Sequence, residues 1–493
     1  MTASLQPECR YQSKCSPGGA VISRVAAALL IAATTSVAQT STSIPNAPGQ
    51  GDPAQGQYAG SVASKPVNGV LQLSLQEAMA RGMKQNLGTL LSEAEIRSSR
   101  GERWQQLSTL LPHVNAAPAI DVSKINLAEE GISLHIPGIN FPTAVGPFSY
   151  FDARASLSQT LFNWKSINNT RAAGANLKAS EFTYKDARDL VVLAVGFTYL
   201  QAVADEARVE TAQAQVDSAK AVYDQASDQV KAGTSPDIDG LRAKVEMQTR
   251  QQQLIQARNS FAIRKLAVSR VIGLAPGQRF DLTDKSLYQP LEVPTVEDAL
   301  QRAYASRSDY QAAIAEVRAA EYSRRSAVAG YFPSLSVNAD YGTGGSHPST
   351  SNEVFDVRGI LSIPIFEGGS VHGDVLQADA RLAQSRERLD NLRGQIDTDV
   401  RTALLNLESS AELVEVARGN IELAEATLTQ SRDRFQAGVT DTVEVVQSQE
   451  AVASAHEQYI SSLYNFNYAK ISLARAVGTA EAGVKEYFKG KQP

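Results

Sequence analysis

The chain has 493 residues, of which 43% are hydrophobic, and a formal net charge of −5 at pH 7. This length allows several ordinary domains, and a pI near 5.7 with dispersed Lys and Arg argues against a nucleic-acid-binding surface. Both cysteines, Cys9 and Cys15, lie near the N-terminus, so the rest of the chain predicts neither disulfides nor thiolate metal sites.

The N-terminus has the pattern of a secretory signal peptide, predicted over residues 1–38. Arg24 precedes an apolar run from Val25 to Ala33, and Ser36-Val37-Ala38 offers a cleavage site of small residues. A membrane anchor is the alternative, but the run is far shorter than the ~20 residues of a spanning helix. The next segment, 39–70, is rich in Ser, Gly, Pro, Gln and Ala and predicts a flexible leader. We find no later apolar stretch of about 18 residues, so no helix is expected to span a bilayer.

The remainder of the chain is an internal duplication. The segment from Leu75 to Arg81 recurs from Val296 to Arg302 at an offset of 221 residues (296 − 75). Further along, Phe151 matches Phe355 at 204 (355 − 151) and Ala232-Gly233 matches Ala437-Gly438 at 205 (437 − 232). The first copy therefore carries 17 extra residues (221 − 204) between Pro112 and Phe151. We predict repeat 1 over 71–283, a linker over 284–293, repeat 2 over 294–482 and a C-terminal tail over 483–493. Two copies suit a unit that builds a ring by pseudo-symmetry.

Helices of unusual length are predicted in each repeat, because proline is absent between Pro147 and Pro236 and again between Pro364 and Pro493. Apolar residues from Leu389 to Leu428 are spaced by threes and fours, as in a narrow coiled-coil seam. A helix from about 369 to 435 would run on the order of 100 Å. Many seam positions are alanine, which favours close helix packing, and the opposite face is polar, as in a wall that faces water.

Each long helix is expected to end in the same kind of turn. Gly233 and Gly438 each follow a helical run, and a new helix opens behind Ser-Pro or Thr-Asp. We predict two helical hairpins with tips near 233 and 438, and a positive φ or a tight contact at both glycines.

Strands with period-two alternation lie between the helices of each repeat. Leu335, Val337, Ala339 and Tyr341 alternate with polar residues, and the pattern predicts β-hairpins at about 113–162 and 334–366 with strands of ~10 residues. A transmembrane barrel and a half-buried soluble hairpin alternate alike, but export and the attached long helices favour the barrel. Four strands cannot close a barrel, since the smallest have about eight, so the chain must assemble.

The sequence gives no sign of an active site. The five histidines are scattered and form no metal-binding pair; they are His113, His135, His347, His372 and His456. No Ser-His-Asp order or carboxylate pair stands out, and Gly342-Thr343-Gly344-Gly345 fits a hairpin loop better than a phosphate loop. We therefore predict no enzyme, no cofactor and no metal. Trp104 and Trp164, where helix meets strand, could be interfacial belt residues or simple packing.

From about 71 to 480 the chain resembles the TolC-type outer-membrane efflux proteins. The resemblance rests on the duplicated entry helix, the Leu/Phe-Pro before each first strand, Leu161-Phe162 and Ile365-Phe366-Glu367-Gly368-Gly369 after each second strand, and the two Ala-Gly tips. It implies a mixed α + β membrane protein in which antiparallel coiled-coil hairpins form an α-barrel in the periplasm. Its two β-hairpins would give four strands per chain to a twelve-stranded outer-membrane β-barrel.

The same resemblance implies a homotrimer in outer-membrane lipid that opens at its periplasmic helical tips. Its partners would be a periplasmic adaptor protein and an inner-membrane transporter, in a tripartite efflux or type I secretion system. A periplasmic coiled-coil adaptor or scaffold without a pore is the alternative from another class. The amphipathic hairpins between the helices count against it, because an adaptor carries no lipid-facing strands.

Aligning the chain with the family on the tip glycines shows which of its residues occupy the positions of the family's gate residues. The first ring carboxylate of the family falls on Glu444 and the second on Gln447, which has no charge. The acidic partner of the closing network falls on Asp239. The tip residues expected to dock the adaptor are Gly233, Thr234, Gly438 and Val439.

The usual tyrosine and arginine partners of that closing network are replaced by Phe435 and Thr440. The latch is therefore expected to be weaker or to use other pairs, such as Asp237 or Asp441 with Lys231 or Arg434. For each of these tip residues the alternative to a role in the gate is a charge that simply faces solvent. For Asp237 and Asp441, helix capping is the favoured role.

Overall fold

Long helices make up most of the chain that the computed structural model describes, which is residues 58–66, 69–127, 129, 131, 143–284, 289–291 and 293–487. These residues belong to one unit, Gly51–Pro493. The expected signal peptide, most of the expected leader, His135 and residues 488–493 lie outside the described residues.

The two longest helices are α3 (Trp164–Lys231), with 68 residues, and α7 (Ser370–Gln436), with 67. Each therefore runs about 100 Å at 1.5 Å per residue. The bounds of α7 confirm the helix expected from about 369 to 435. Asn163 caps the start of α3, where its side chain accepts a hydrogen bond of 3.1 Å from the Ser166 backbone N–H.

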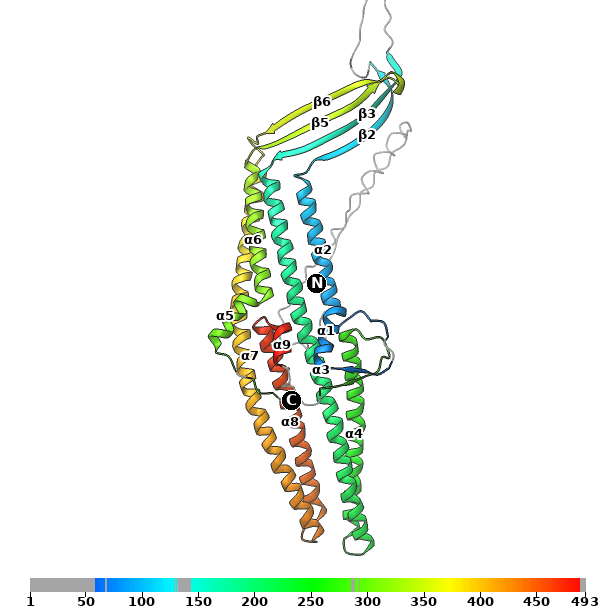
Figure 1. The fold of residues 1–493 in the computed structure, drawn as a ribbon, viewed down its shortest axis with the longest axis vertical. Coiled ribbons are helices and arrows are strands. Elements are labelled where there is room, and N and C mark those ends of the chain that lie inside the picture. The colour runs from blue at the N-terminus through cyan, green and yellow to red at the C-terminus, as the bar shows by residue number, and fades with distance from the viewer. Residues whose placement is uncertain are drawn as a thin grey trace, which may run out of the picture. The chain divides into compact units, whose positions relative to one another are not determined.

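Each long helix folds back into a second helix, α4 (Asp237–Ile272) or α8 (Thr442–Ala476). α3 packs against α4, α7 against α8, and α3 also against α8, so these helices lie in the order α4, α3, α8, α7 (Figure 1). Many buried contact positions are alanine, including Ala202, Ala219 and Ala226. The hairpins and their alanine-rich seams are as predicted.

A second group of helices lies between the hairpins and the sheet. α2 (Leu87–Ser108) packs against α3, and α6 (Ser308–Val328) packs between α3 and α7, so the order here is α2, α3, α6, α7 (Figure 1). A short 3₁₀ turn, η2 (Ala329–Tyr331), follows α6.

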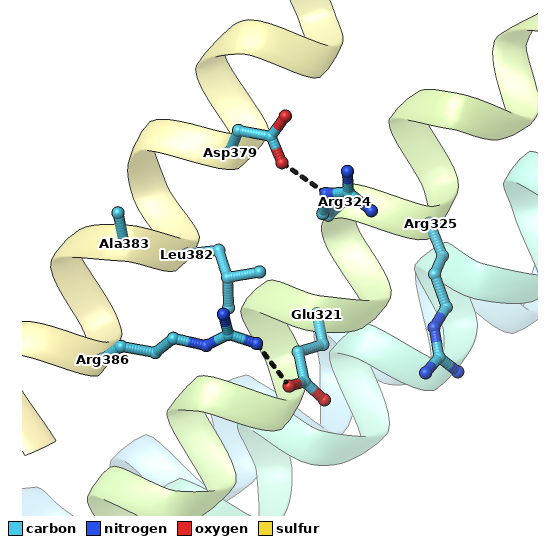
Figure 2. Close-up of a pocket in the computed structure, with 7 residues that line it drawn as sticks. All are labelled: Glu321, Arg324, Arg325, Asp379, Leu382, Ala383 and Arg386. Atoms are coloured by element: carbon cyan, nitrogen blue, oxygen red, sulfur yellow. Dashed lines mark hydrogen bonds and ion pairs between the residues drawn. The ribbon is translucent and has the colours of Figure 1, made fainter.

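Ion pairs join α6 to α7 around a hollow of about 400 Å³. Figure 2 shows Arg324 directed at Asp379 and Arg386 directed at Glu321, while Arg325 points away from both acids. Arg386 Nη2 lies 3.2 Å from Glu321 Oε1. Four of the charged side chains that line this hollow thus pair across the two helices and link α6 to α7.

Four antiparallel strands form one sheet in the order β2, β3, β5, β6. Their bounds are β2 (His113–Asn126), β3 (Ala144–Phe162), β5 (Ser334–Gly345) and β6 (Asn352–Ser362), with a 3₁₀ turn η3 (Pro348–Thr350) before β6. The first hairpin is longer than the ~10 residues expected per strand, with strands of 14 and 19 residues. The ladder between β3 and β5 begins only at Phe151, and the β3 segment 144–150 pairs with β2 alone. The extra residues of the first copy thus lengthen this hairpin.

Short elements form a core midway along the long helices. β1 (Leu71–Leu73) pairs in parallel with β4 (Phe280–Leu282), beside α1 (Leu75–Gln85) and α5 (Val296–Ser306). The buried hydroxyl of Tyr199 donates to the Leu73 carbonyl oxygen at 2.9 Å. α9 (Ala480–Tyr487) crosses the boundary expected at 482 and packs on α8 and α3. The β1–β4 ladder was not predicted.

The statement that no later stretch of about 18 residues is apolar enough to cross a bilayer was wrong. α3 contains a window of 18 residues that is apolar enough to cross a bilayer, although 61% of that window is buried inside the protein. By length and composition alone this helix could cross a membrane, but its packing is that of a core helix.

The two tryptophans that flank the strands also differ, since Trp104 is 61% exposed whereas Trp164 stacks on Phe162 with ring centroids 6.4 Å apart.

Candidate functional site

The two tip turns have the same backbone geometry. Gly233 and Gly438 adopt φ of 73° and 70°, which confirms the expected positive φ at both. The amide of Thr234 donates to the Gln229 carbonyl at 2.9 Å, and that of Val439 donates to the Arg434 carbonyl at 3.0 Å. This is the Schellman end of a helix, in which glycine is favoured by its left-handed conformation. A Cβ at either glycine would meet nothing within 4 Å, so backbone conformation and not crowding selects glycine.

Both candidate gate acids are tied to a hydroxyl of the preceding turn. Ser235 Oγ donates to Asp239 Oδ2 at 2.9 Å, and Thr440 Oγ1 donates to Glu444 Oε2. Asp239 and Glu444 stand at the repeat offset of 205 residues (444 − 239), as do Ser235 and Thr440 (440 − 235). The two gate candidates are therefore one repeat position present twice. The offset alone could have revealed this pairing, which the motif alignment missed.

The two acids differ in exposure. The side chain of Asp239 is 10% exposed, and its Oδ1 lies 3.6 Å from Arg242 Nη1 on the same helix. The side chain of Glu444 is 34% exposed, and its Oε1 lies 3.2 Å from Arg434 Nη1 across the turn. Ser431 Oγ donates to the same oxygen at 3.4 Å. Glu444 is thus braced within its hairpin and still reaches solvent.

The structure gives the expected latch residues other partners. Lys231 pairs with Asp228 at 3.0 Å, and Arg434 pairs with Glu444, so neither is paired with Asp237 or Asp441. Asp441 caps α8, where it accepts from the Val443 amide at 3.1 Å. Asp237 is the first residue of α4 and makes no cap, because Pro236 holds the N-cap position.

A groove of about 380 Å³ separates the first turns of α4 and α8. Apolar side chains line most of it, namely Ile238, Leu241, Val245, Val443 and Val446. Gln447 of α8 also lines this groove, as do Arg242 and Glu246 of α4. Thr234 and Val439, which were expected to dock an adaptor, are exposed on the tip turns.

Polar contacts couple the two hairpins above the tips. Ser218 of α3 accepts from Gln449 Nε2 of α8 at 2.9 Å and from Arg432 of α7. Higher up, Arg208 Nη2 lies 2.8 Å from Glu457 Oε1. Burial raises the pKa of Glu457, but the hydrogen bonds and charge of Arg208 outweigh it and leave the pKa of Glu457 below its usual value. Motif alignment pointed to none of these residues, since a serine or glutamine within a helix has no spacing signal of its own.

The sheet has one apolar and one polar face. Two residue rows run in register across all four strands on the apolar side; they are Val114, Leu157, Ala339 and Val357, and Ala116, Ala155, Tyr341 and Phe355. Val114, Tyr341, Phe355 and Val357 are between 62% and 71% exposed. A sheet face of this kind would be costly in water but suits contact with lipid.

Comparison with known proteins gives matches in both repeats. The pattern that defines the outer membrane efflux protein family matches residues 90–274 and 299–479. The chain is 24% identical over 413 residues to the pyoverdine export outer membrane protein OpmQ of Pseudomonas aeruginosa, covering 82% of this chain and 84% of OpmQ. It is 23% identical over 323 residues to the alkaline protease secretion protein AprF of the same species, covering 63% of this chain and 66% of AprF.

The fold also matches solved outer-membrane channels. The Campylobacter jejuni CmeC channel superposes with a TM-score of 0.70 at 18% identity, over 84% of this chain and 89% of CmeC. At this identity the likeness concerns the fold, and it includes both the helical hairpins and the strands.

Proposed function

Because the chain belongs to the outer membrane efflux protein family, we propose that three copies close into the outer-membrane exit duct of a tripartite efflux pump or type I secretion system. The family consists of transport ducts of the outer membrane and not of enzymes. A pore-less adaptor has no support, since the matching proteins are outer-membrane export and channel proteins.

The observation that carries the assembly is an open edge on each side of every layer. The sheet ends in β2 on one side and β6 on the other. The helical layers end in α2 or α4 on the side of the first repeat and in α7 on the side of the second. In each layer the first-repeat edge lies on one side of the chain and the second-repeat edge on the other. A single rotation axis can therefore join the first-repeat edges of one chain to the second-repeat edges of the next, in all layers at once.

Closure is also favoured by the membrane and by the apolar helix edges. An open sheet edge is not tolerated in lipid, and three chains of four strands give an even-numbered barrel of twelve. On α4 the exposed large apolar side chains are Ile238, Leu241, Val245, Ile255, Ile263 and Leu266; on the part of α7 after residue 400 they are Leu405, Leu413, Val416 and Leu423. Contact between α4 of one chain and α7 of the next would bury both sets.

We place the gate at the tips, where Glu444 of each chain approaches the axis. Three partly exposed carboxylates there would favour cations, with Arg434 as the local counter-charge. Asp239 holds the turn of the other hairpin, and Gln447 contributes no charge. The tip turns at Gly233, Thr234, Gly438 and Val439 present the surface for a periplasmic adaptor, which links the duct to an inner-membrane transporter.

The wall itself does not define a cargo. Two similar relatives are named for unlike cargoes, pyoverdine and alkaline protease. We therefore assign cargo selection to the inner-membrane transporter and not to this chain.

Disulfide cross-linking tests the assembly directly, because both native cysteines lie in the expected signal peptide. Ile255 lies 18 residues above the start of α4 (255 − 237) and Val416 lies 20 residues above the end of α7 (436 − 416), so both are at similar heights. The double variant Ile255→Cys/Val416→Cys should yield covalent trimers of about 150 kDa under oxidation, because each chain of 52.8 kDa falls to about 50 kDa once the expected signal peptide is removed. Each single variant is the control and should stay monomeric on a denaturing gel. A stable monomer in detergent by light scattering would overturn the proposal.

A further inference from the structure

The polar face of the sheet carries charged side chains that the proposed gate does not use. One row on this face runs Asn115, Ser156, Asp340 and Asp356 in register across the four strands. On the neighbouring rows of the same face, Arg154 lies opposite Gly342, Asp152 opposite Gly344, and Arg358 opposite Asn338. Since side chains alternate between faces, all these residues point away from the apolar rows.

These charges form two linked clusters. Arg154 lies 2.8 Å from Asp152 and 3.4 Å from Asp340, and it also donates to the Tyr150 hydroxyl at 3.3 Å. Arg358 lies 2.9 Å from Asp356. Asp340 and Asp356 stand directly opposite each other on β5 and β6, an arrangement that repels unless counter-charges are near. Each of the two acids has its own arginine.

A glycine helps Arg154 to reach across the strands. Gly342 is its direct neighbour on β5, and a Cβ there would collide with the Ala153 carbonyl oxygen. Glycine at position 342 therefore lets β5 approach β3 closely beside Arg154, whose guanidinium reaches Asp340 two residues away on β5. The cluster is therefore built by close strand approach as well as by charge.

We propose that Asp152, Arg154, Asp340, Asp356 and Arg358 form a charged belt inside the β-barrel that acts as a second ion filter, distant from the tips. This belt rests on the proposed function, because it needs the sheet to close with its polar face inward. Each chain contributes three carboxylates and two guanidiniums, so the belt of a trimer has a net charge of −3 and favours cations.

The size of the barrel allows such a belt to act on ions in the lumen. Twelve strands about 4.8 Å apart and tilted by about 40° give a backbone radius of about 12 Å. Side chains that reach about 5 Å inward from this radius end about 7 Å from the barrel axis. This distance is close to the Debye length of about 8 Å at physiological ionic strength. The belt should therefore influence permeation at physiological salt and lose most of its effect at about 1 M, where the Debye length is ~3 Å.

The test is the cation-to-anion permeability ratio of reconstituted channels in a salt gradient. Asp356→Asn should lower the ratio by about twofold at 0.1 M salt, and Arg358→Gln should raise it by a similar factor, with both effects fading at 1 M. These two residues are preferred because their side chains are 42% and 68% exposed and each has the other as ion-pair partner, so folding is little disturbed. Glu353→Gln is the matched control, since Glu353 lies on β6 in register with Thr343, on the apolar face.

The outcomes separate the belt from the duct itself. Opposite changes in the two variants, with none in Glu353→Gln, support the belt and cannot come from a general loss of structure. Conducting channels whose ion selectivity is unchanged in both variants would overturn the belt and leave the duct intact. Absence of any conductance from the unmodified trimer would overturn the proposed function and the belt with it.

Discussion

Removal of the Glu444 carboxylate should change the ion selectivity of the duct without unfolding it. The perturbation is Glu444→Gln, which keeps the size of the side chain and its hydrogen bond from Thr440 but removes the charge that faces Arg434. The side chains of this ion pair are 34% and 50% exposed, so the free energy of unfolding should change by no more than about 1 kcal/mol.

The effect on ions can be worked out from Coulomb's law. For an ion about 8 Å from each of three carboxylates, water-like screening gives about 0.5 kcal/mol per charge. At physiological salt the Debye factor reduces the sum to about 0.6 kcal/mol, which corresponds to a factor of about three in permeability.

Reversal potentials of single channels in a salt gradient measure this ratio. We expect Glu444→Gln to lower the cation-to-anion permeability ratio about sevenfold, because cation permeability falls and anion permeability rises by a factor of nearly three each, and Arg434→Gln to raise the ratio. The thermal midpoint of the trimer serves as the control for folding. Unchanged selectivity in both variants would refute the reasoning, since it would mean that this ion pair lies away from the permeation path.

Two other substitutions test the tip turn and the buried charges. Gly438→Val forces a β-branched residue into φ of 70°, so it should cost about 1 kcal/mol or more and weaken adaptor binding in a pull-down; wild-type binding and melting would contradict this. Burial, more than any neighbouring charge, raises the pKa of Asp189 to about 6, so its ionised form opposes folding above that pH and ceases to do so below about 4. Asp189→Asn should raise the free energy of unfolding at pH 7.5 by up to about 3 kcal/mol, measured as a higher melting temperature, and should have little effect near pH 4. Equal gains in melting temperature at both pH values would count against the burial argument.

The regular parts of the fold could be predicted because their signals extend over many residues. Two stretches without proline indicated α3 and α7, and alternation from Leu335 to Tyr341 indicated β5. β1 and β4 have three residues each and show too little periodicity to be recognised. The length of β3 also escaped prediction, because residues 144–150 extend beyond its partner β5 and pair only with β2, whose alternation is irregular.

The candidate site was predictable in position but not in its contacts. Gly233 and Gly438, which recur in the two repeats, located both tips, because a turn with a left-handed backbone conformation favours glycine. Ion-pair partners on two helices depend instead on how each helix is rotated about its axis. The spacing of residues in the sequence does not determine this rotation when a turn separates the helices. For that reason the Arg434–Glu444 pair and the contacts of Ser218 with α7 and α8 became visible only in the structure.

The unequal exposure of Asp239 and Glu444 has a consequence for the symmetry of the aperture. Six hairpins around one axis would alternate between a tip whose carboxylate is enclosed and a tip whose carboxylate meets water. A trimer of duplicated chains, with six similar hairpins, would thus have threefold and not sixfold symmetry at its aperture, and only every second tip would offer its carboxylate to ions in the pore.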